Sequence, residues 1–328
     1  MHIPDGFVDL PIAAATGVIA AAVVVGAVRK TGKDLGDRTV PLLGVTAAFI
    51  FAAQMLNFPV VAGTSGHFLG ALLAAALLGP WAATLTLTVV LIAQALVMAD
   101  GGVTALGANV TNMAVIAVFA GYGAFLLLKR LLPRTPTGYL VSVAVASWLS
   151  VVAAAAACAV ELGLSGTVPL RTALATMVSV HMVIGIGEAL ITAAVVSAVL
   201  VARPDLVASF DLPRESIRRA GRKRMSGASR VWSYVAVVFV IAAALALFVS
   251  PFASSSPDGL ESVAQAHGID ASQATPVWQF SPLGDYRLPG IESEGVSAAL
   301  AGLIGTIALF ALVIGAGRVL GRKRTESG

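Results

Sequence analysis

Nine apolar stretches constrain the fold of this chain more than any other feature. They lie near residues 11–28, 40–58, 67–79, 81–99, 109–128, 139–161, 172–201, 232–250 and 296–316. Most of them approach or exceed the length of about 20 residues that an α-helix needs to cross the hydrocarbon core of a bilayer. Charged residues make up only 12% of the chain, roughly half of their share in soluble domains. The sequence therefore predicts an all-α integral membrane protein.

The distribution of positive charge indicates how these segments cross the membrane. The stretch at 67–79 is short, and Gly79-Pro80 after it marks either a turn or a kink in one longer helix. If the N-terminus lies outside and nine spans alternate, then of the 21 lysines and arginines only Arg171 and Arg287 fall on the outer side. This agrees with the positive-inside rule, whereas one merged span over 67–98 would reverse every later loop. We therefore predict a hairpin at Gly79-Pro80, an extracytoplasmic N-terminus and a cytoplasmic C-terminus.

A polar segment divides the chain into two parts. Residues 203–230 (RPDLVASFDLPRESIRRAGRKRMSGASR) are basic and contain proline and glycine. Such a composition is typical of a solvated linker beside lipid headgroups rather than of a nucleic-acid site. We predict a seven-span domain over 1–205, a cytoplasmic linker over 206–230, and a two-span domain over 231–328 with an acidic outer loop at about 251–295.

The first two residues, Met1 and His2, can chelate a metal ion through three nitrogens. These are the Met1 amine, the deprotonated main-chain amide of His2, and His2 Nδ1. Because they close a five-membered and then a six-membered ring, they favour a planar set that suits Ni(II), Cu(II) or Co(II) better than Zn(II) or Mg(II). Most histidines bind no metal, so these two residues alone favour the interpretation of His2 as an ordinary polar residue.

The other histidines also fall at the outer side of the predicted topology. His67 follows a glycine-rich turn (GTSGHFLG) and could supply a fourth nitrogen, although a structural role is commoner for a histidine at the start of a helix. His181 and Glu188 lie seven residues apart on one face of the stretch 172–201. An ionisable residue inside a span marks a functional or tightly paired site, but a simple packing hydrogen bond is equally open here. We assign no ligand role to His267.

Polar residues of the outer segments could orient the ligating nitrogens. Groups behind a metal-binding histidine commonly fix its tautomer and the angle of its ring. Asp100 and Asn109, for example, flank a glycine-rich loop (DGGVTALGAN) and could instead cap the next helix. The candidates for this supporting role are Asn57, Ser65, Asp100, Asn109, His181 and Glu188.

Missing motifs narrow the range of functions. The chain contains no GxxxxGK[ST] loop for ATP hydrolysis and no HExxH metalloprotease motif. Its single cysteine, Cys158, rules out a disulfide within the chain.

Two alternative hypotheses remain. One is a secondary transporter or channel in which Glu188 and His181 relay protons or cations, and which depends on an ion gradient. The other is a membrane enzyme, which would need an open metal position that a closed square of nitrogens lacks.

Four blocks in the first part resemble a known transporter component. MHIPDGFVD, NFPVVAGTSGHFLGA, DGGVTALGANVTNMA and HMVIGIGEALIT are similar to the signatures of the nickel/cobalt substrate-binding (M) component of energy-coupling-factor (ECF) transporters. This resemblance covers about residues 1–205. The tail, with SSSPDGLESVAQAHGI and SPLGDYRLPGI between two spans, resembles the small N component of the same systems, including its PDGLE element. The whole chain therefore resembles a fused M and N component.

The resemblance carries specific implications. It implies a seven-helix substrate-binding domain joined to a two-helix membrane domain in a prokaryotic cytoplasmic membrane. It implies a square of nitrogens from the Met1 amine, the His2 amide and imidazole, and His67. Ni(II) or Co(II) would be the transported substrate, with no permanently bound cofactor and no enzymatic activity of the chain itself. The implied partners are a transmembrane coupling subunit (T or Q type) and cytoplasmic ABC ATPases (O type). Acid should weaken capture, because His2 and His67 would protonate.

Overall fold

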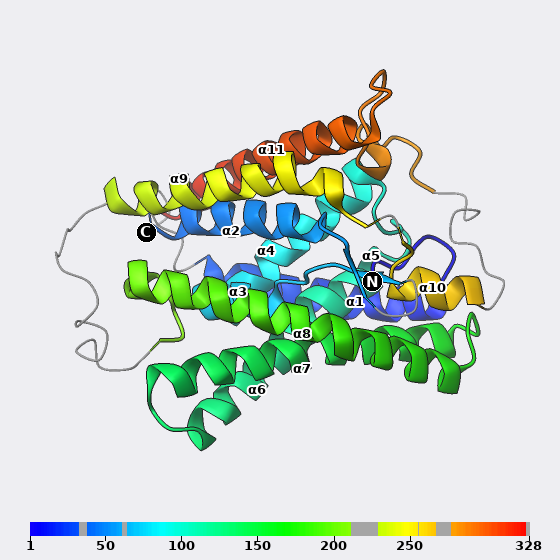
Figure 1. Cartoon of the computed structure of the whole chain (residues 1–328), viewed down its shortest axis with the longest axis horizontal. Coiled ribbons are helices and arrows are strands. Elements are labelled where there is room, and N and C mark those ends of the chain that lie inside the picture. Colours follow the sequence, from blue (N-terminus) through cyan, green and yellow to red (C-terminus); the bar gives the residue numbers. More distant parts are fainter. Residues whose placement is uncertain (33–37, 61–63, 211–228, 255, 267–276, 326–328) are drawn as a thin grey trace.

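Helices that run roughly along one axis make up most of the molecule (Figure 1). The computed structural model describes residues 1–32, 38–60, 64–210, 229–254, 256–266 and 277–325. Within these ranges, seven helical segments are long and apolar enough to cross a membrane: Leu10–Thr31, Pro80–Met98, Leu106–Leu131, Pro136–Leu164, Leu170–Ala202, Val231–Phe252 and Glu294–Val319. The prediction of an all-α, multi-pass membrane protein is confirmed.

The elements follow one another in a simple order. The first part contains α1 (Leu10–Thr31), α2 (Thr39–Gln54), strands β1 (Phe58–Pro59) and β2 (Ser65–Gly66), α3 (Ala71–Leu78), α4 (Pro80–Ala93), α5 (Leu106–Asn109), α6 (Ala117–Leu131), α7 (Pro136–Leu164) and α8 (Leu170–Ala202). The second part contains α9 (Ser229–Ala244), α10 (Gly259–Ala266) and α11 (Glu294–Thr325). Stretches of π-helix extend α4 over Gln94–Met98 and α9 over Leu245–Val249, and another joins α5 to α6 over Val110–Ile116. The two strands pair antiparallel, with Phe58 opposite Gly66.

Local sequence explains where two of the long helices begin. The side chain of Asp9 accepts a hydrogen bond from the main-chain N–H of Ile12 at 3.1 Å and so caps α1. Thr135 caps α7 in the same way, with its hydroxyl 3.1 Å from the N–H of Gly138. Pro136 then occupies the first helical position, where the missing N–H of proline costs nothing.

The stretch predicted as a span at 67–79 is only partly helical. α3 has eight residues, so its length is about 12 Å, and it cannot cross a bilayer alone. The prediction of a full helical span was wrong because residues 67–70 are not helical and α3 begins only at Ala71. The predicted hairpin is present: α3 packs against α4, and the chain reverses at Gly79 with φ +82° before Pro80 starts α4. Glycine adopts this left-handed conformation without steric cost.

Contacts between the connecting segments show which of them lie together at each end of the bundle. At one end, Arg38 pairs with Asp205 at 2.7 Å. At the other end, the main-chain N–H of Ser254 donates to the carbonyl of Asn57 at 2.7 Å. This grouping agrees with the alternation of loops that the charge pattern predicted. Most of the predicted linker 206–230, and His267, lie outside the described residues.

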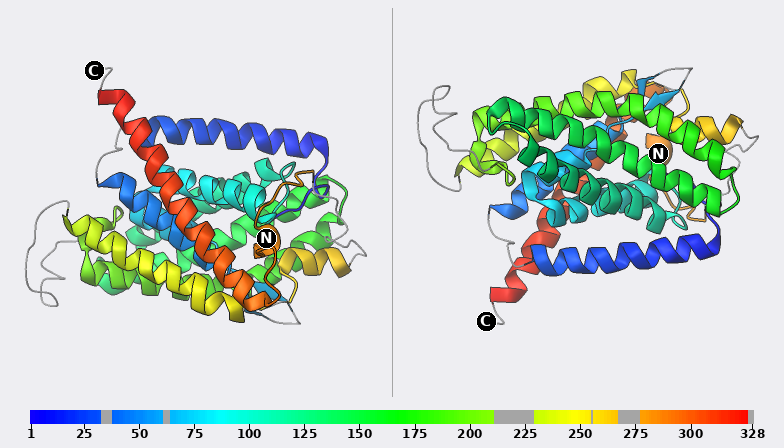
Figure 2. Two further views of the ribbon diagram at one scale, coloured as in Figure 1. Left: turned by 90° about the horizontal axis from the view of Figure 1, so that it is seen from above. Right: turned by 90° about the horizontal axis from the view of Figure 1, so that it is seen from below.

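The second part of the chain packs against the first (Figure 2). α9 and α11 both lie along α2, and α11 crosses the bundle obliquely. α10 packs on α8, close to the N-terminus of the chain (Figure 1). The loop between α9 and α11 is therefore placed where it can reach the first residues of the protein.

Candidate metal site

The N-terminal segment enters the interior of the bundle instead of lying on its surface. Met1 is only 5% exposed and Ile3 is fully buried. Asn109 holds Ile3 from both sides: the N–H of Ile3 donates to Asn109 Oδ1 at 2.8 Å, and Asn109 Nδ2 donates to the Ile3 carbonyl at 3.1 Å. The N–H of Gly102 donates to the same carbonyl at 2.8 Å. This clamp fixes the position of the two residues that precede Ile3.

Asp5 ties the same segment to two other parts of the chain. Its Oδ1 accepts hydrogen bonds from the main-chain N–H of Thr104 at 2.8 Å and from the Thr104 hydroxyl at 2.6 Å. Its Oδ2 accepts from the N–H of Val277 at 2.9 Å. The N-terminus is thus fastened to the loop before α5 and to the segment that leads to α11.

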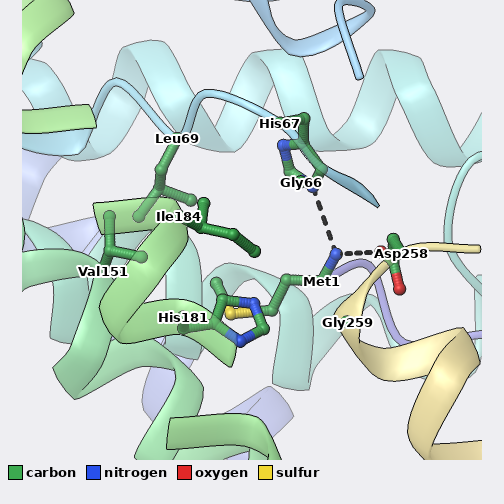
Figure 3. Close-up of a pocket in the computed structure, with 9 residues that line it drawn as sticks. All are labelled: Met1, Gly66, His67, Leu69, Val151, His181, Ile184, Asp258 and Gly259. Atoms are coloured by element: carbon green, nitrogen blue, oxygen red, sulfur yellow. Dashed lines mark hydrogen bonds and ion pairs between the residues drawn. The ribbon is translucent and has the colours of Figure 1, made fainter. Parts of the chain in front are cut away.

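The Met1 amine lies beside the imidazole of His67 (Figure 3), with the amine nitrogen 3.1 Å from Nε2. His67 Nδ1 lies 3.0 Å from the carbonyl of Phe68. A carbonyl can only accept, so this contact places the ring proton on Nδ1 and leaves a lone pair on Nε2. The structure thus brings together the amine and the histidine that the sequence singled out.

The His2 ring stacks on that of His67, with centroids 5.1 Å apart and an interplanar angle of 20°. His2 Nδ1 lies 3.1 Å from Asp100 Oδ1, and His2 Nε2 lies 3.2 Å from Gln94 Oε1. Chelation through Nδ1 therefore requires the His2 side chain to turn away from Asp100. Within the described parts of the chain, the main-chain N–H of His2 has no hydrogen-bond partner, so it is available to a metal ion.

Glu188 fixes the turn that carries His67. Its two carboxylate oxygens accept hydrogen bonds from the main-chain N–H groups of Leu69 at 2.6 Å and Gly70 at 2.8 Å. These groups lie at the start of α3, where N–H groups lack helical partners and attract an anion. Gln54 Nε2 donates to the Leu69 carbonyl at 2.9 Å. Glu188 therefore positions the chain next to His67 and does not face the Met1 amine.

The remaining candidates for a supporting role lie around the same centre. Asp100 contacts His2 and also accepts a hydrogen bond from the Tyr286 hydroxyl at 2.6 Å. The Ser65 hydroxyl donates to the carbonyl of Ser256 at 2.7 Å. His181 Nδ1 lies 2.7 Å from the carbonyl of Met177 in its own helix. Asn57 borders a cavity of about 580 Å³ that His2, His67, Asp100 and Asp258 also line.

Asp258, which the sequence did not single out, lies next to the Met1 amine. Its carboxylate forms an ion pair with the Met1 amine, and both line a small pocket with His67 and His181 (Figure 3). Asp258 belongs to the PDGLE block, in which an aspartate precedes a glutamate by three residues. That spacing is typical of a helix-capping box and could have indicated a helix start here, but not its contact with residue 1.

Burial and charge set the protonation states at this site. Burial would lower the pKa of the Met1 amine, but the charge and hydrogen bond of Asp258 outweigh it and raise that pKa above its ordinary 8.0. Burial and the nearby amine charge lower the pKa of His67 to about 3, and burial lowers that of His2. Burial would raise the pKa of Asp258, but the amine lowers it well below its usual range. The proton that competes with a metal near neutral pH is therefore on the amine, not on the imidazoles.

The described residues contain no group of three or more His, Cys, Asp or Glu side chains arranged to hold a metal ion. The candidate donors at this site are of another kind, since two of them are main-chain nitrogens rather than side-chain atoms. An amine, an amide and two neutral imidazoles offer four nitrogens, which is the donor set that planar Ni(II) or Cu(II) prefers.

Comparisons with known proteins find similarity to metal transport proteins. Residues 2–206 match the family model described as "Cobalt uptake substrate-specific transmembrane region", and residues 232–322 match the PDGLE domain. The chain is 36% identical over 95% of its length to a putative fused nickel transport protein of Archaeoglobus fulgidus, of which it covers 96%. It is 32% identical over 74% of its length to a fused nickel transport protein of Rhodobacter capsulatus, of which it covers 71%. It is also similar to a crystal structure of a transition metal transporter, with a TM-score of 0.57 and 36% identity over 67% of this chain and all of that one.

Proposed function

The chain belongs to the family of cobalt uptake substrate-specific transmembrane proteins, and from this premise we propose that it captures Ni(II) or Co(II) in a planar site of four nitrogens. The donors are the Met1 amine, the His2 amide and imidazole, and His67 Nε2. The relatives described above are named as nickel transport proteins, and the family model is described as one of cobalt uptake, so these two ions are the substrates that we assign to this chain. The metal is cargo and not a resident cofactor.

One contact carries this proposal: the Met1 amine lies 3.1 Å from the unprotonated Nε2 of His67. These atoms come from residues 1 and 67 and meet inside the bundle, where Asn109 and Glu188 fix the chain on either side. Side chains that hold the ligating groups in place before the metal binds reduce the entropy lost on binding. The sequence contains no HExxH metalloprotease motif, which disfavours the alternative of a metalloenzyme.

The alternative of a relay through His181 and Glu188 has less support. Glu188 uses both of its oxygens on main-chain N–H groups, and His181 Nδ1 faces a carbonyl of its own helix. A proton or cation relay needs groups that can exchange their partners along a path. Both residues instead act as supports in our proposal.

We further propose the division of labour that the family resemblance implies. Residues 1–205 form the metal-binding domain, 206–230 a cytoplasmic linker, and 231–328 a second membrane domain. The N-terminus faces the extracytoplasmic side of a prokaryotic cytoplasmic membrane, as the distribution of basic residues favours. A transmembrane coupling subunit and cytoplasmic ABC ATPases then drive release, since the sequence contains no P-loop of its own.

A two-residue extension tests the site directly. Two glycines added ahead of Met1 move the free amine away from the His2 amide and imidazole and should abolish high-affinity Ni(II) binding in the purified full-length protein. A single added glycine is unsuitable, because the new amine, two amides and the His2 imidazole would form another planar set of four nitrogens. The same two glycines added after Gly328 are the matched control and should leave the affinity unchanged. His67→Ala should leave a three-nitrogen site of much weaker affinity. Unchanged Ni(II) affinity in the N-terminally extended protein would refute the proposed donors.

A further inference from the structure

The two carboxylate oxygens of Asp258 have different partners. Oδ1 accepts hydrogen bonds from the main-chain N–H groups of Leu260 at 2.7 Å and Glu261 at 2.9 Å. Glu261 in return accepts from the N–H of Asp258 at 3.0 Å. This reciprocal pair is a capping box, and it starts α10. Oδ2 is directed instead to the Met1 amine. One side chain therefore links the start of a helix in the second part of the chain to the first residue of the protein.

The turn around Asp258 is seated firmly on the first part of the chain. Ser65 forms a parallel bridge with Asp258, and the N–H of Ser65 donates to the carbonyl of Pro257 at 2.8 Å. Gly259 lies against the ring of His181, where an added Cβ would be 2.8 Å from Cε1. Leu260 is 1% exposed. These contacts come from the β2 strand that precedes His67 and from α8, so the position of Asp258 is tied to that of the metal-binding turn.

The negative charge of Asp258 balances one positive charge at the Met1 amine, both with and without a bound metal ion. Without metal, the ammonium group carries one positive charge. When Ni(II) replaces one proton on the amine and the proton of the His2 amide, the sum of ion and amidate is again one positive charge. The coordinated amine keeps two N–H groups, and one of them can still donate to Oδ2. A buried charge without its partner is strongly unfavourable, so both states need a carboxylate here.

We propose that Asp258 is a positioning residue of the metal site, which the second part of the chain supplies as counter-ion and hydrogen-bond acceptor of the ligating Met1 amine. This inference rests on the proposed function, and it makes the site a composite of both parts of the chain. Partners that orient ligating groups typically contribute 10- to 100-fold in metal affinity, roughly. We expect a loss of this size when the charge at Asp258 is removed.

Asp258→Asn separates the two tasks of this residue. Asparagine is as good a helix cap as aspartate, so its Oδ1 preserves the start of α10, while its amide nitrogen cannot accept from the amine. Glu261→Gln is the matched control, because it removes one negative charge from the same capping box but leaves the amine contact unchanged. Both variants and the parent are titrated with Ni(II) as purified full-length proteins, with the absorption band of planar Ni(II) as a second readout.

The expected result is a 10- to 100-fold weaker Ni(II) affinity for Asp258→Asn with the planar band retained at saturation, and a change below about threefold for Glu261→Gln. Serine also caps helices well but carries no charge, so Asp258→Ser should show the same loss of affinity as Asp258→Asn. Agreement between the two variants would show that the loss does not come from a folding defect of one of them. Parent affinity in Asp258→Asn, or an equal loss in Glu261→Gln, would overturn the assignment. His67→Ala tests the proposed site itself, because it should lose the absorption band of planar Ni(II). If His67→Ala keeps this band, the proposed site is wrong; if it loses the band but Asp258→Asn binds like the parent, only the role of Asp258 is wrong.

Discussion

Nickel capture by the proposed site should release about two protons near neutral pH. One leaves the Met1 amine, because its ion pair with Asp258 outweighs the effect of burial, raises its pKa and favours the protonated form. The other leaves the main-chain N–H of His2, which must become an amidate to bind the metal. His67 contributes none, because burial and the nearby amine charge lower its pKa to about 3, and His2 contributes little, because burial lowers its pKa.

The magnitude follows from these protonation states. A group whose pKa is raised above 8.0 is more than about 90% protonated at pH 7, so the amine contributes close to one proton. Each released proton changes the logarithm of the affinity by one per pH unit, about 1.4 kcal/mol. Protons and metal compete for the same nitrogens, so affinity rises with pH. Between pH 6.5 and 7.5 we expect an increase of about 100-fold.

Calorimetric titration in buffers of different ionisation enthalpy measures this number directly. At pH 7.0 the slope of binding enthalpy against buffer ionisation enthalpy should correspond to about two protons released per Ni(II). A site built only from imidazoles and carboxylates would release almost none, since those groups are already deprotonated. A measured value below about one proton would refute the participation of the amine and amide.

Two substitutions test the supports of the site, and a third tests the α3–α4 turn. Glu188→Gln replaces one of the two acceptor oxygens that face Leu69 and Gly70 by a donor. It should therefore lower the unfolding free energy by about 1–3 kcal/mol and weaken Ni(II) binding. An unchanged melting temperature and an unchanged affinity would contradict this role. Asn109→Ala removes the clamp on Ile3 and should weaken Ni(II) binding at least tenfold, roughly, as titration would show; parent affinity would mean that residues 1–3 are held by other contacts. Gly79→Ala forces alanine into φ +82° and ψ 160° at the far end of α3. Thermal denaturation should show a loss of about 1–3 kcal/mol, while Ni(II) affinity stays the same. A matching loss of affinity would show that the α3–α4 turn is coupled to the site.

Much of the fold could be predicted from the sequence because bilayer crossing imposes strict rules on length and charge. The long spans and the hairpin at Gly79-Pro80 followed from apolar length, glycine and proline chemistry, and the placement of basic residues. The segment at 67–79 could not be predicted in the same way, because composition does not distinguish a helix from a buried extended segment that carries His67. Its main-chain N–H groups need the Glu188 carboxylate, which lies more than a hundred residues later.

The candidate site was predictable only in part, for a related reason. The chelating geometry of Met1-His2 is local and can be worked out from two residues. Met1 and Asp258 are 257 positions apart in the sequence, so no local pattern can predict their contact. The capping spacing from Asp258 to Glu261 indicates a helix start, but only the three-dimensional structure shows that the second carboxylate oxygen points at the N-terminus.

X-ray absorption at the nickel K-edge of the Ni(II)-loaded full-length protein tests the central claim most directly. The proposed square of Met1, His2 and His67 predicts four-coordinate, planar nickel with nitrogen donors only, and with scattering from two imidazole rings. Six-coordinate nickel, or a first shell that contains oxygen or sulfur donors, would contradict it.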